Sequence, residues 1–211
     1  MQLTKLGHAC VRLQKAGATL VIDPGSWSGP DALTGANAVL VTHEHADHLD
    51  ADAIRTAMTA DGDLQLWSNA AVTGQFGEFG DRVHTVAEGD TFTTAGFDVQ
   101  VQGQHHAVIV PEIPVVRNIG FRVDGEVFHP GDSFTVPAER VGTILVPVSA
   151  PWLKFAEVDQ YIRAAGAARG YAIHDAIMSK FGVGLVSNLL KVVSPADAPV
   201  IRLEPGTTVD L

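Results

Sequence analysis

The stretch of this 211-residue chain that decides its fold is AVLVTHEHADH, residues 38–48. Its four apolar residues predict a buried strand, and three histidines and Asp47 follow within six residues. Alternate side chains of an extended segment share a face, so His43 and His45 point the same way, and a turn can bring Asp47 and His48 beside them. Imidazoles and carboxylates are ligands that zinc and similar divalent ions prefer. Without a metal, such groups at the end of an apolar strand would be left unpaired, at about 1–3 kcal/mol each. We therefore predict a metal site rather than a solvated histidine-rich loop.

The composition around this stretch excludes several classes of protein. The chain has 14 Lys and Arg against 24 Asp and Glu, a net charge of −10, which argues against binding a long nucleic acid. A hydrophobic content of 46% with 18% charged residues is typical of a compact globular protein. The single cysteine, Cys10, excludes an internal disulfide framework and a zinc site made only of cysteines. No apolar run reaches membrane-spanning length and the N-terminus resembles no secretory signal, so we expect a cytoplasmic protein.

The alternation of apolar and turn-forming residues predicts many strands with helices between them. Strands are expected over 3–6, 10–14, 19–22, 38–41, 64–67, 97–101, 118–123, 126–129, 143–146 and 169–173. Helices are expected over 53–58, 69–76, 156–165 and 175–190. No linker, repeat or low-complexity tract divides the chain, which predicts a single domain over residues 1–211. This order favours two β-sheets packed face to face with helices outside, an α/β sandwich.

The order H-x-H-x-D-H after an apolar strand, as it stands in residues 43–48, resembles the signature of the metallo-β-lactamase superfamily. Later parts of the chain resemble the remaining ligand positions of that family, in the same order and each at a strand end. These parts are Gln104-His105-His106-Ala107, Pro130-Gly131-Asp132-Ser133 and Ala172-Ile173-His174-Asp175. The resemblance is to the small, lactonase-like branch of metal-dependent hydrolases, and it implies a four-layer αββα sandwich.

The resemblance also implies two metal ions, with zinc expected and manganese, iron or nickel open. The implied ligands of one ion are His43, His45 and a histidine of the His105-His106 pair; those of the other are Asp47, His48 and His174, with Asp132 bridging the two. We predict His106 as the ligand of the pair, since similar small members carry a single histidine directly before Ala at this point.

Other residues have two interpretations each. Asp23 resembles the family's aspartate that orients the ligand histidines, with a turn residue before Pro24 as the alternative. His8 resembles the N-terminal Gly-His of the lactonase-like branch, with a hairpin histidine of no functional role as the alternative. Trp152 and Lys154 either line the pocket or pack structurally. His84 and His129 we interpret as structural or exposed.

The resemblance implies metal-dependent hydrolysis of a small ester, lactone or phosphoester by an activated hydroxide, with Asp47 as ligand and orienter of that hydroxide. His45 stands where the flavodiiron branch has Glu, which favours hydrolysis over redox chemistry. Two alternatives stay open: a phosphodiesterase acting on a small nucleotide, and a non-catalytic metal-binding protein that retains the fold. As partners we expect a small-molecule substrate and no membrane, in a monomer or small homo-oligomer.

Overall fold

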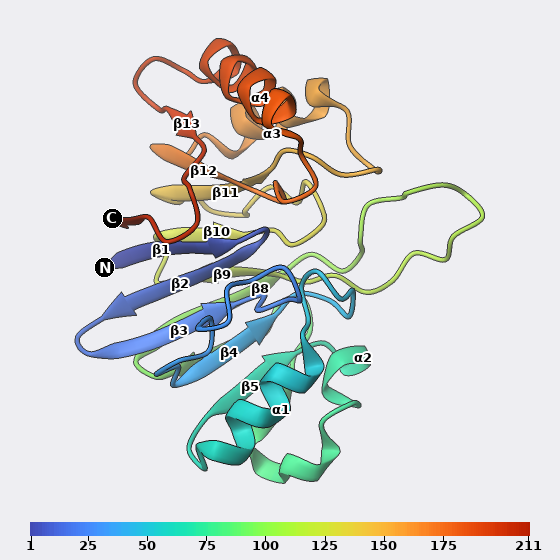
Figure 1. The fold of residues 1–211 in the computed structure, drawn as a ribbon, viewed down its shortest axis with the longest axis vertical. Coiled ribbons are helices and arrows are strands. Elements are labelled where there is room, and N and C mark those ends of the chain that lie inside the picture. Colours follow the sequence, from blue (N-terminus) through green and yellow to red (C-terminus); the bar gives the residue numbers. More distant parts are fainter.

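Two seven-stranded sheets lie face to face in the computed structural model, which describes residues 1–211 (Figure 1). The first sheet has the order β14 (Thr208–Asp210), β1 (Gln2–Gly7), β2 (Cys10–Lys15), β3 (Ala18–Ile22), β4 (Ala38–Val41), β5 (Gln65–Ser68) and β6 (Val83–Thr85). The second has the order β13 (Val200–Ile201), β12 (Arg169–Ile173), β11 (Thr143–Pro147), β10 (Val127–His129), β9 (Gly120–Val123), β8 (Phe97–Gln102) and β7 (Thr91–Thr94). Each sheet therefore combines an antiparallel meander with a parallel half.

Helices connect most of the parallel strands in each sheet and cover its outer face. The first sheet carries α1 (Ala51–Ala60), α2 (Ala70–Thr73) and a 3₁₀ turn over Gly77–Arg82, and the second carries α3 (Phe155–Ala165) and α4 (Lys180–Val193). Parallel strands need such crossovers because their ends lie on opposite edges of the sheet. Figure 1 shows α1 and α2 on one side of the two sheets and α3 and α4 on the other.

Three apolar clusters separate the layers. A cluster of 20 buried residues, including Leu13 and Phe121, fills the space between the sheets. A second, of 13 residues including Ile54, lies under α1 and α2, and a third, of 14 residues including Leu190, lies under α3 and α4. Helix, sheet, sheet and helix are thus held by three continuous cores, and the predicted αββα sandwich is confirmed.

The elements differ from the sequence predictions in two ways. The strands that were not predicted, β6, β7, β13 and β14, are the outermost strands of the two sheets, where two to four residues suffice and the apolar pattern is weak. Helix α4 begins at Lys180 rather than at 175, because the Ser179 side chain caps it by accepting from the N–H of Gly182. The predicted helix over 69–76 is reduced to α2, which Gly74 ends. None of the helices is both long enough and apolar enough to cross a bilayer.

Candidate metal centre

The seven residues predicted as metal ligands lie at one edge of the sandwich, beyond the carboxyl ends of strands from both sheets. His43 follows β4, His106 follows β8, Asp132 follows β10 and His174 directly follows β12. Their donor atoms fall into three overlapping groups, within each of which all donor atoms lie within 4.8 Å of one another. The strand order alone therefore gathers residues that are up to 131 positions apart in the chain.

The first group consists of His43, His45 and His106. Their ring centroids are separated by 4.6 Å (His43 to His45), 5.1 Å (His43 to His106) and 4.9 Å (His45 to His106). Burial lowers the pKa of His43 well below its ordinary value, so this imidazole is neutral and one of its ring nitrogens keeps an unprotonated lone pair. His105, the other member of the pair, is exposed and outside the group, and its backbone forms a bridge with Arg117.

The second group consists of Asp47, His48 and His174, joined by His8. The Nδ1 of His174 donates to the carbonyl of Ser149 at 2.6 Å, which leaves its Nε2 facing the group. That Nε2 lies 3.5 Å from Oδ2 of Asp47. The arrangement resembles a metal site, in which ligand histidines commonly donate their outer N–H to an oxygen and present the other nitrogen to the ion.

Asp132 lies between the two groups. Its Oδ1 is 2.9 Å from Nε2 of His48, and its Oδ2 is 3.0 Å from Nε2 of His174 and 3.2 Å from Nε2 of His106. Trp152, which is buried, donates from its indole Nε1 to the same Oδ2 at 3.0 Å. One carboxylate thus faces imidazoles of both groups and is held by an indole from outside them.

Three buried polar atoms at this centre lack a hydrogen bond: Nε2 of His48, Oδ1 of Asp132 and Nε2 of His174. The first two are only 2.9 Å apart, so the failure lies in direction rather than in distance. Leaving three such atoms unpaired would cost about 1–3 kcal/mol each. Divalent ions would satisfy all three, and a set of five imidazoles and two carboxylates is the donor set that zinc and similar ions select. The residues present therefore fit divalent metal ions.

In the absence of an ion, the carboxylates of the centre favour the protonated, positively charged forms of His48 and His174. Burial opposes protonation of His48, but the negative charges of Asp132 and Asp23 raise its pKa well above the ordinary value. Burial likewise opposes protonation of His174, and its contacts with Asp132 and Asp47 still raise its pKa to about 9. Protons and metal ions therefore compete for the same two nitrogens.

Asp23 orients one of the predicted ligands. Its buried side chain accepts from the backbone N–H of Thr42 at 2.7 Å and from the Thr42 hydroxyl at 2.8 Å, and lies 2.6 Å from Nδ1 of His48. Asp23 has a φ of 52°, and His8 and His174 have φ angles of 35° and 59°. These left-handed conformations are strained for residues other than glycine, and their presence at the centre is typical of a functional site.

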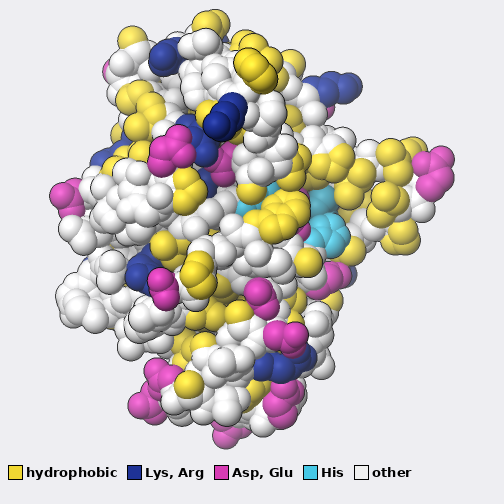
Figure 2. Space-filling view, viewed as in Figure 1, with side chains coloured by type: hydrophobic (Ala, Val, Ile, Leu, Met, Phe, Trp, Pro, Cys, Tyr) yellow, Lys and Arg dark blue, Asp and Glu magenta, His cyan; other side chains and the backbone are white.

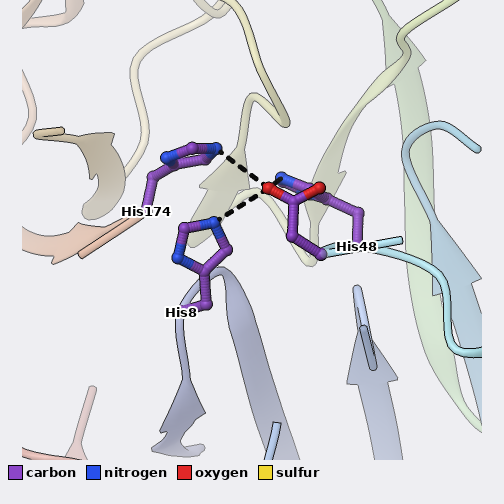
Figure 3. A group of neighbouring side chains, drawn as sticks. His8, His48 and His174 are labelled. Atoms are coloured by element: carbon purple, nitrogen blue, oxygen red, sulfur yellow. Dashed lines mark hydrogen bonds and ion pairs between the residues drawn. The ribbon is translucent and has the colours of Figure 1, made fainter. Parts of the chain in front are cut away.

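His8 is the residue for which the sequence left function and structure equally open. Its Nδ1 accepts from the backbone N–H of Ala176 at 3.2 Å, so the ring proton is on Nε2. This Nε2 therefore donates to Oδ2 of Asp47, 3.1 Å away. Figure 3 shows His8 and His174 approaching the same carboxylate from two sides. The sequence signal was only the Gly7-His8 dipeptide, because the contact joins positions 39 residues apart.

The remaining candidates lie outside the centre. Lys154 is exposed at the start of α3, where its backbone N–H donates to Glu157. His129 is buried and structural: its Nε2 donates to the carbonyl of Ala9 at 2.8 Å. His84 stacks on Trp67 with ring centroids 3.9 Å apart.

Two glycines allow the backbone to approach closely here. A Cβ at Gly25 would lie 2.0 Å from the carbonyl oxygen of Asp47. A Cβ at Gly131, which has a φ of 62°, would lie 2.2 Å from Oδ1 of Asn118. The same Oδ1 accepts from the N–H of Asp132 at 2.9 Å. Glycine is thus required next to both carboxylates of the centre.

Comparisons with known proteins agree with this geometry. Residues 2–169 match the family model of a β-lactamase superfamily domain. The chain is 36% identical over 214 residues to Protein Rv0786c of Mycobacterium tuberculosis, covering 99% of this chain and 100% of that protein. It is 30% identical over 160 residues to a UPF0173 metal-dependent hydrolase of Methanopyrus kandleri, covering 70% of this chain and 69% of that one. Among solved structures, Igni18, a metallo hydrolase of Ignicoccus hospitalis, is similar with a TM-score of 0.76 at 19% identity, covering 99% of this chain and 97% of that one. At that identity the likeness concerns the fold alone.

Proposed function

Because the chain belongs to the metallo-β-lactamase superfamily, we propose that it is a metal-dependent hydrolase of a small ester, lactone or phosphoester, formed by one domain over residues 1–211. The observation that carries the proposal is the convergence of Nε2 of His48, Nε2 of His174 and Oδ1 of Asp132, all buried and without hydrogen bonds. The name of the Methanopyrus relative, a metal-dependent hydrolase, supports the same activity.

We assign two ions to the centre, with zinc as the first expectation and manganese, iron or nickel as alternatives that accept the same donors. In this assignment one ion would be held by His43, His45 and His106 and the other by Asp47, His48 and His174, and Asp132 would serve both. Asp132 suits the bridging role because its two oxygens face imidazoles of both groups.

Bound ions of this kind polarise the oxygen of a scissile bond and lower the pKa of a water toward neutrality. The chain's own contribution is the placement of two carboxylates of different access: the side chain of Asp47 is 20% exposed and that of Asp132 only 4%. Burial alone would raise the pKa of Asp47, but contacts with His174 and His8 hold it well below its ordinary value. Asp47 therefore stays an anion that can accept a hydrogen bond from the attacking water and orient it. His8 restrains Oδ2 of that carboxylate from the far side.

Metal analysis combined with a substrate panel tests this function. The protein is loaded with zinc or manganese, its metal content is measured by mass spectrometry, and hydrolysis of esters, lactones and phosphodiesters is assayed. We expect about two ions per chain and turnover of a carboxylic ester or lactone. Turnover of phosphodiesters alone would indicate the phosphodiesterase alternative. Two ions without turnover of any class would indicate a non-catalytic metal-binding protein, and no bound metal would refute both metal-based readings.

A further inference from the structure

The segment between β8 and β9 projects from the body of the molecule beside the metal centre (Figure 1). Its outer part, residues 107–116, has the sequence AVIVPEIPVV, and we refer to it as the apolar loop. Both ends of the apolar loop are fixed at the centre. The N–H of His106 donates to the carbonyl of Val116 at 3.1 Å, and the N–H of Ala107 donates to the carbonyl of Asp132 at 2.8 Å.

The apolar loop exposes side chains that would normally be buried. The exposed fractions are 58% for Val108, 43% for Val110, 48% for Ile113 and 45% for Val115. Glu112 is the only charged residue among its ten positions. Figure 2 shows hydrophobic side chains covering this projection and lying next to the histidines. Contiguous exposed apolar surface on a soluble protein commonly marks a binding site.

Other segments present apolar side chains close to the same centre. Trp27 is 49% exposed, and its ring packs edge-on against His8 with centroids 4.8 Å apart. Ile177, 51% exposed, comes three residues after His174. On the inner side of the apolar loop, a small cavity is lined by His45 and His106 together with apolar residues that include Ile113. Imidazoles of the first group and apolar side chains of the loop therefore share one continuous surface.

We propose that the apolar loop binds the hydrocarbon part of the substrate, so that the enzyme prefers carboxylic esters or lactones with an alkyl or acyl chain. This inference rests on the proposed function and names its substrate class. The apolar loop contains no Lys or Arg, the residues that would recognise a phosphate group. Arg117 follows the loop directly, but it lines a different cavity, with Asn69 and Glu88. A chain seated on Ile113 and Val115 would lie directly beside the imidazoles of His45 and His106.

Hydrolysis of p-nitrophenyl esters from acetate to octanoate tests the preference. Full burial of a methylene corresponds to about a fourfold gain in affinity, so for a half-exposed surface we expect kcat/KM to rise about twofold per methylene. The double variant Ile113→Ser/Val115→Ser, which changes two exposed residues of that cavity's lining, should lose most of this dependence on chain length. The matched control Val192→Ser/Ile201→Ser changes two exposed residues of α4 and β13, 78% and 47% exposed, and should keep it.

A binding measurement separates failure of this inference from failure of the proposed function. Calorimetric titration with linear carboxylates from acetate to octanoate needs no turnover. We expect affinity to rise about twofold per methylene for the natural protein and the control, and to stay flat for the loop variant. Binding that depends on chain length, without hydrolysis of any ester or lactone, would support the apolar loop and refute the hydrolase. Hydrolysis without such dependence would refute the loop proposal alone.

The oligomeric state provides a further check, by light scattering on the same three proteins. We expect all three to have the same mass. If the natural protein and the control were dimers and the loop variant a monomer, the apolar loop would be a contact between copies of the chain, and the proposal would be overturned.

Discussion

Two buried charged networks lie side by side in this protein, and two consecutive residues, His174 and Asp175, belong to different ones. Asp175 belongs to a closed network, in which Oδ1 accepts from Nζ of Lys5 at 2.9 Å and Oδ2 from Nε of Arg202 at 2.7 Å. Nζ of Lys5 also donates to the carbonyl of Ala172 at 3.0 Å. His174, one residue earlier, belongs to the metal centre, where its Nε2 has no hydrogen bond.

The two networks differ in whether their polar atoms are paired, and this difference distinguishes a structural network from a candidate binding site. The closed network satisfies its polar atoms within the chain, so it needs no ligand and holds the segment after β12 in place. The metal centre leaves buried atoms of His48, Asp132 and His174 open, and such an arrangement is stable only with protons or cations from outside. Burial by itself does not distinguish the two, since Lys5 is 1% exposed and His174 is 4% exposed.

The largest expected effect is on the open network. Replacing Asp47 with Ala should lower kcat/KM by about 10³-fold, because the partly exposed carboxylate that we assign to orienting the attacking water is lost. The matched control is Asp52→Ala on α1. The Asp52 side chain is 98% exposed and does not belong to the metal centre. Steady-state kinetics with circular dichroism on both variants would check this. Full activity of Asp47→Ala would remove Asp47 from the mechanism.

A smaller effect is expected from opening the closed network. Replacing Lys5 with Met leaves Asp175 with Arg202 as its only charged partner, and we expect a loss of about 3 kcal/mol in the free energy of unfolding. Urea denaturation of the metal-free protein measures it. The control Lys15→Met removes a lysine that is about one-third exposed and paired with Asp124, and should cost less than about 1 kcal/mol. Equal losses for the two variants would contradict the comparison.

His8 contacts both a predicted ligand, Asp47, and the backbone of Ala176, and we expect its replacement to have a moderate effect. His8→Phe keeps the ring but removes the N–H donated to Asp47, and we expect metal affinity and kcat/KM to fall by about 10–100-fold. His8→Gln, which can still donate, should recover part of both. Metal affinity is measured by competition with a chromophoric chelator. No difference between Phe and Gln would mean that His8 acts only by packing.

The smallest change requires no mutation. Because the pKa of His174 is raised to about 9 in the metal-free protein, an ion must displace its proton at neutral pH. Apparent metal affinity should therefore rise with pH up to about 9, and fall by about tenfold per pH unit below it for each proton displaced. Proton release on zinc binding, measured calorimetrically in two buffers of different ionisation enthalpy, checks this. Affinity independent of pH between 6 and 8 would contradict it.

Much of this architecture was predictable from the sequence. The run from Ala38 to His48 and the later Gly131-Asp132 and Ile173-His174 pieces were each placed at a strand end, and the family resemblance implied that they share one metal site. The αββα class is confirmed by the structure. The structure also brings His106 rather than His105 into the histidine group, although the ligand roles themselves stay predictions.

Other features depend on contacts that sequence patterns do not encode. The indole of Trp152 reaches Asp132, and the imidazole of His8 reaches Asp47, only after both sheets have packed. Each of the four edge strands has a neighbouring strand on one side only. Such strands are short and bury few side chains, so their sequences show only a weak apolar alternation. The run at 107–116 is as apolar as a core strand, and only the structure shows that it projects from the molecule.

The pairing of β1 with β14 joins two segments about 200 residues apart in the sequence. Gln2 is in register with Asp210 and Thr4 with Thr208, so β1 stays an uncovered edge of the first sheet until β14 has been synthesised and has paired with it. An uncovered edge strand can pair with another nascent chain, and contacts of such long sequence separation form slowly. Deletion of residues 208–211 should therefore reduce the yield of folded protein in the cell, although none of these residues belongs to the metal centre.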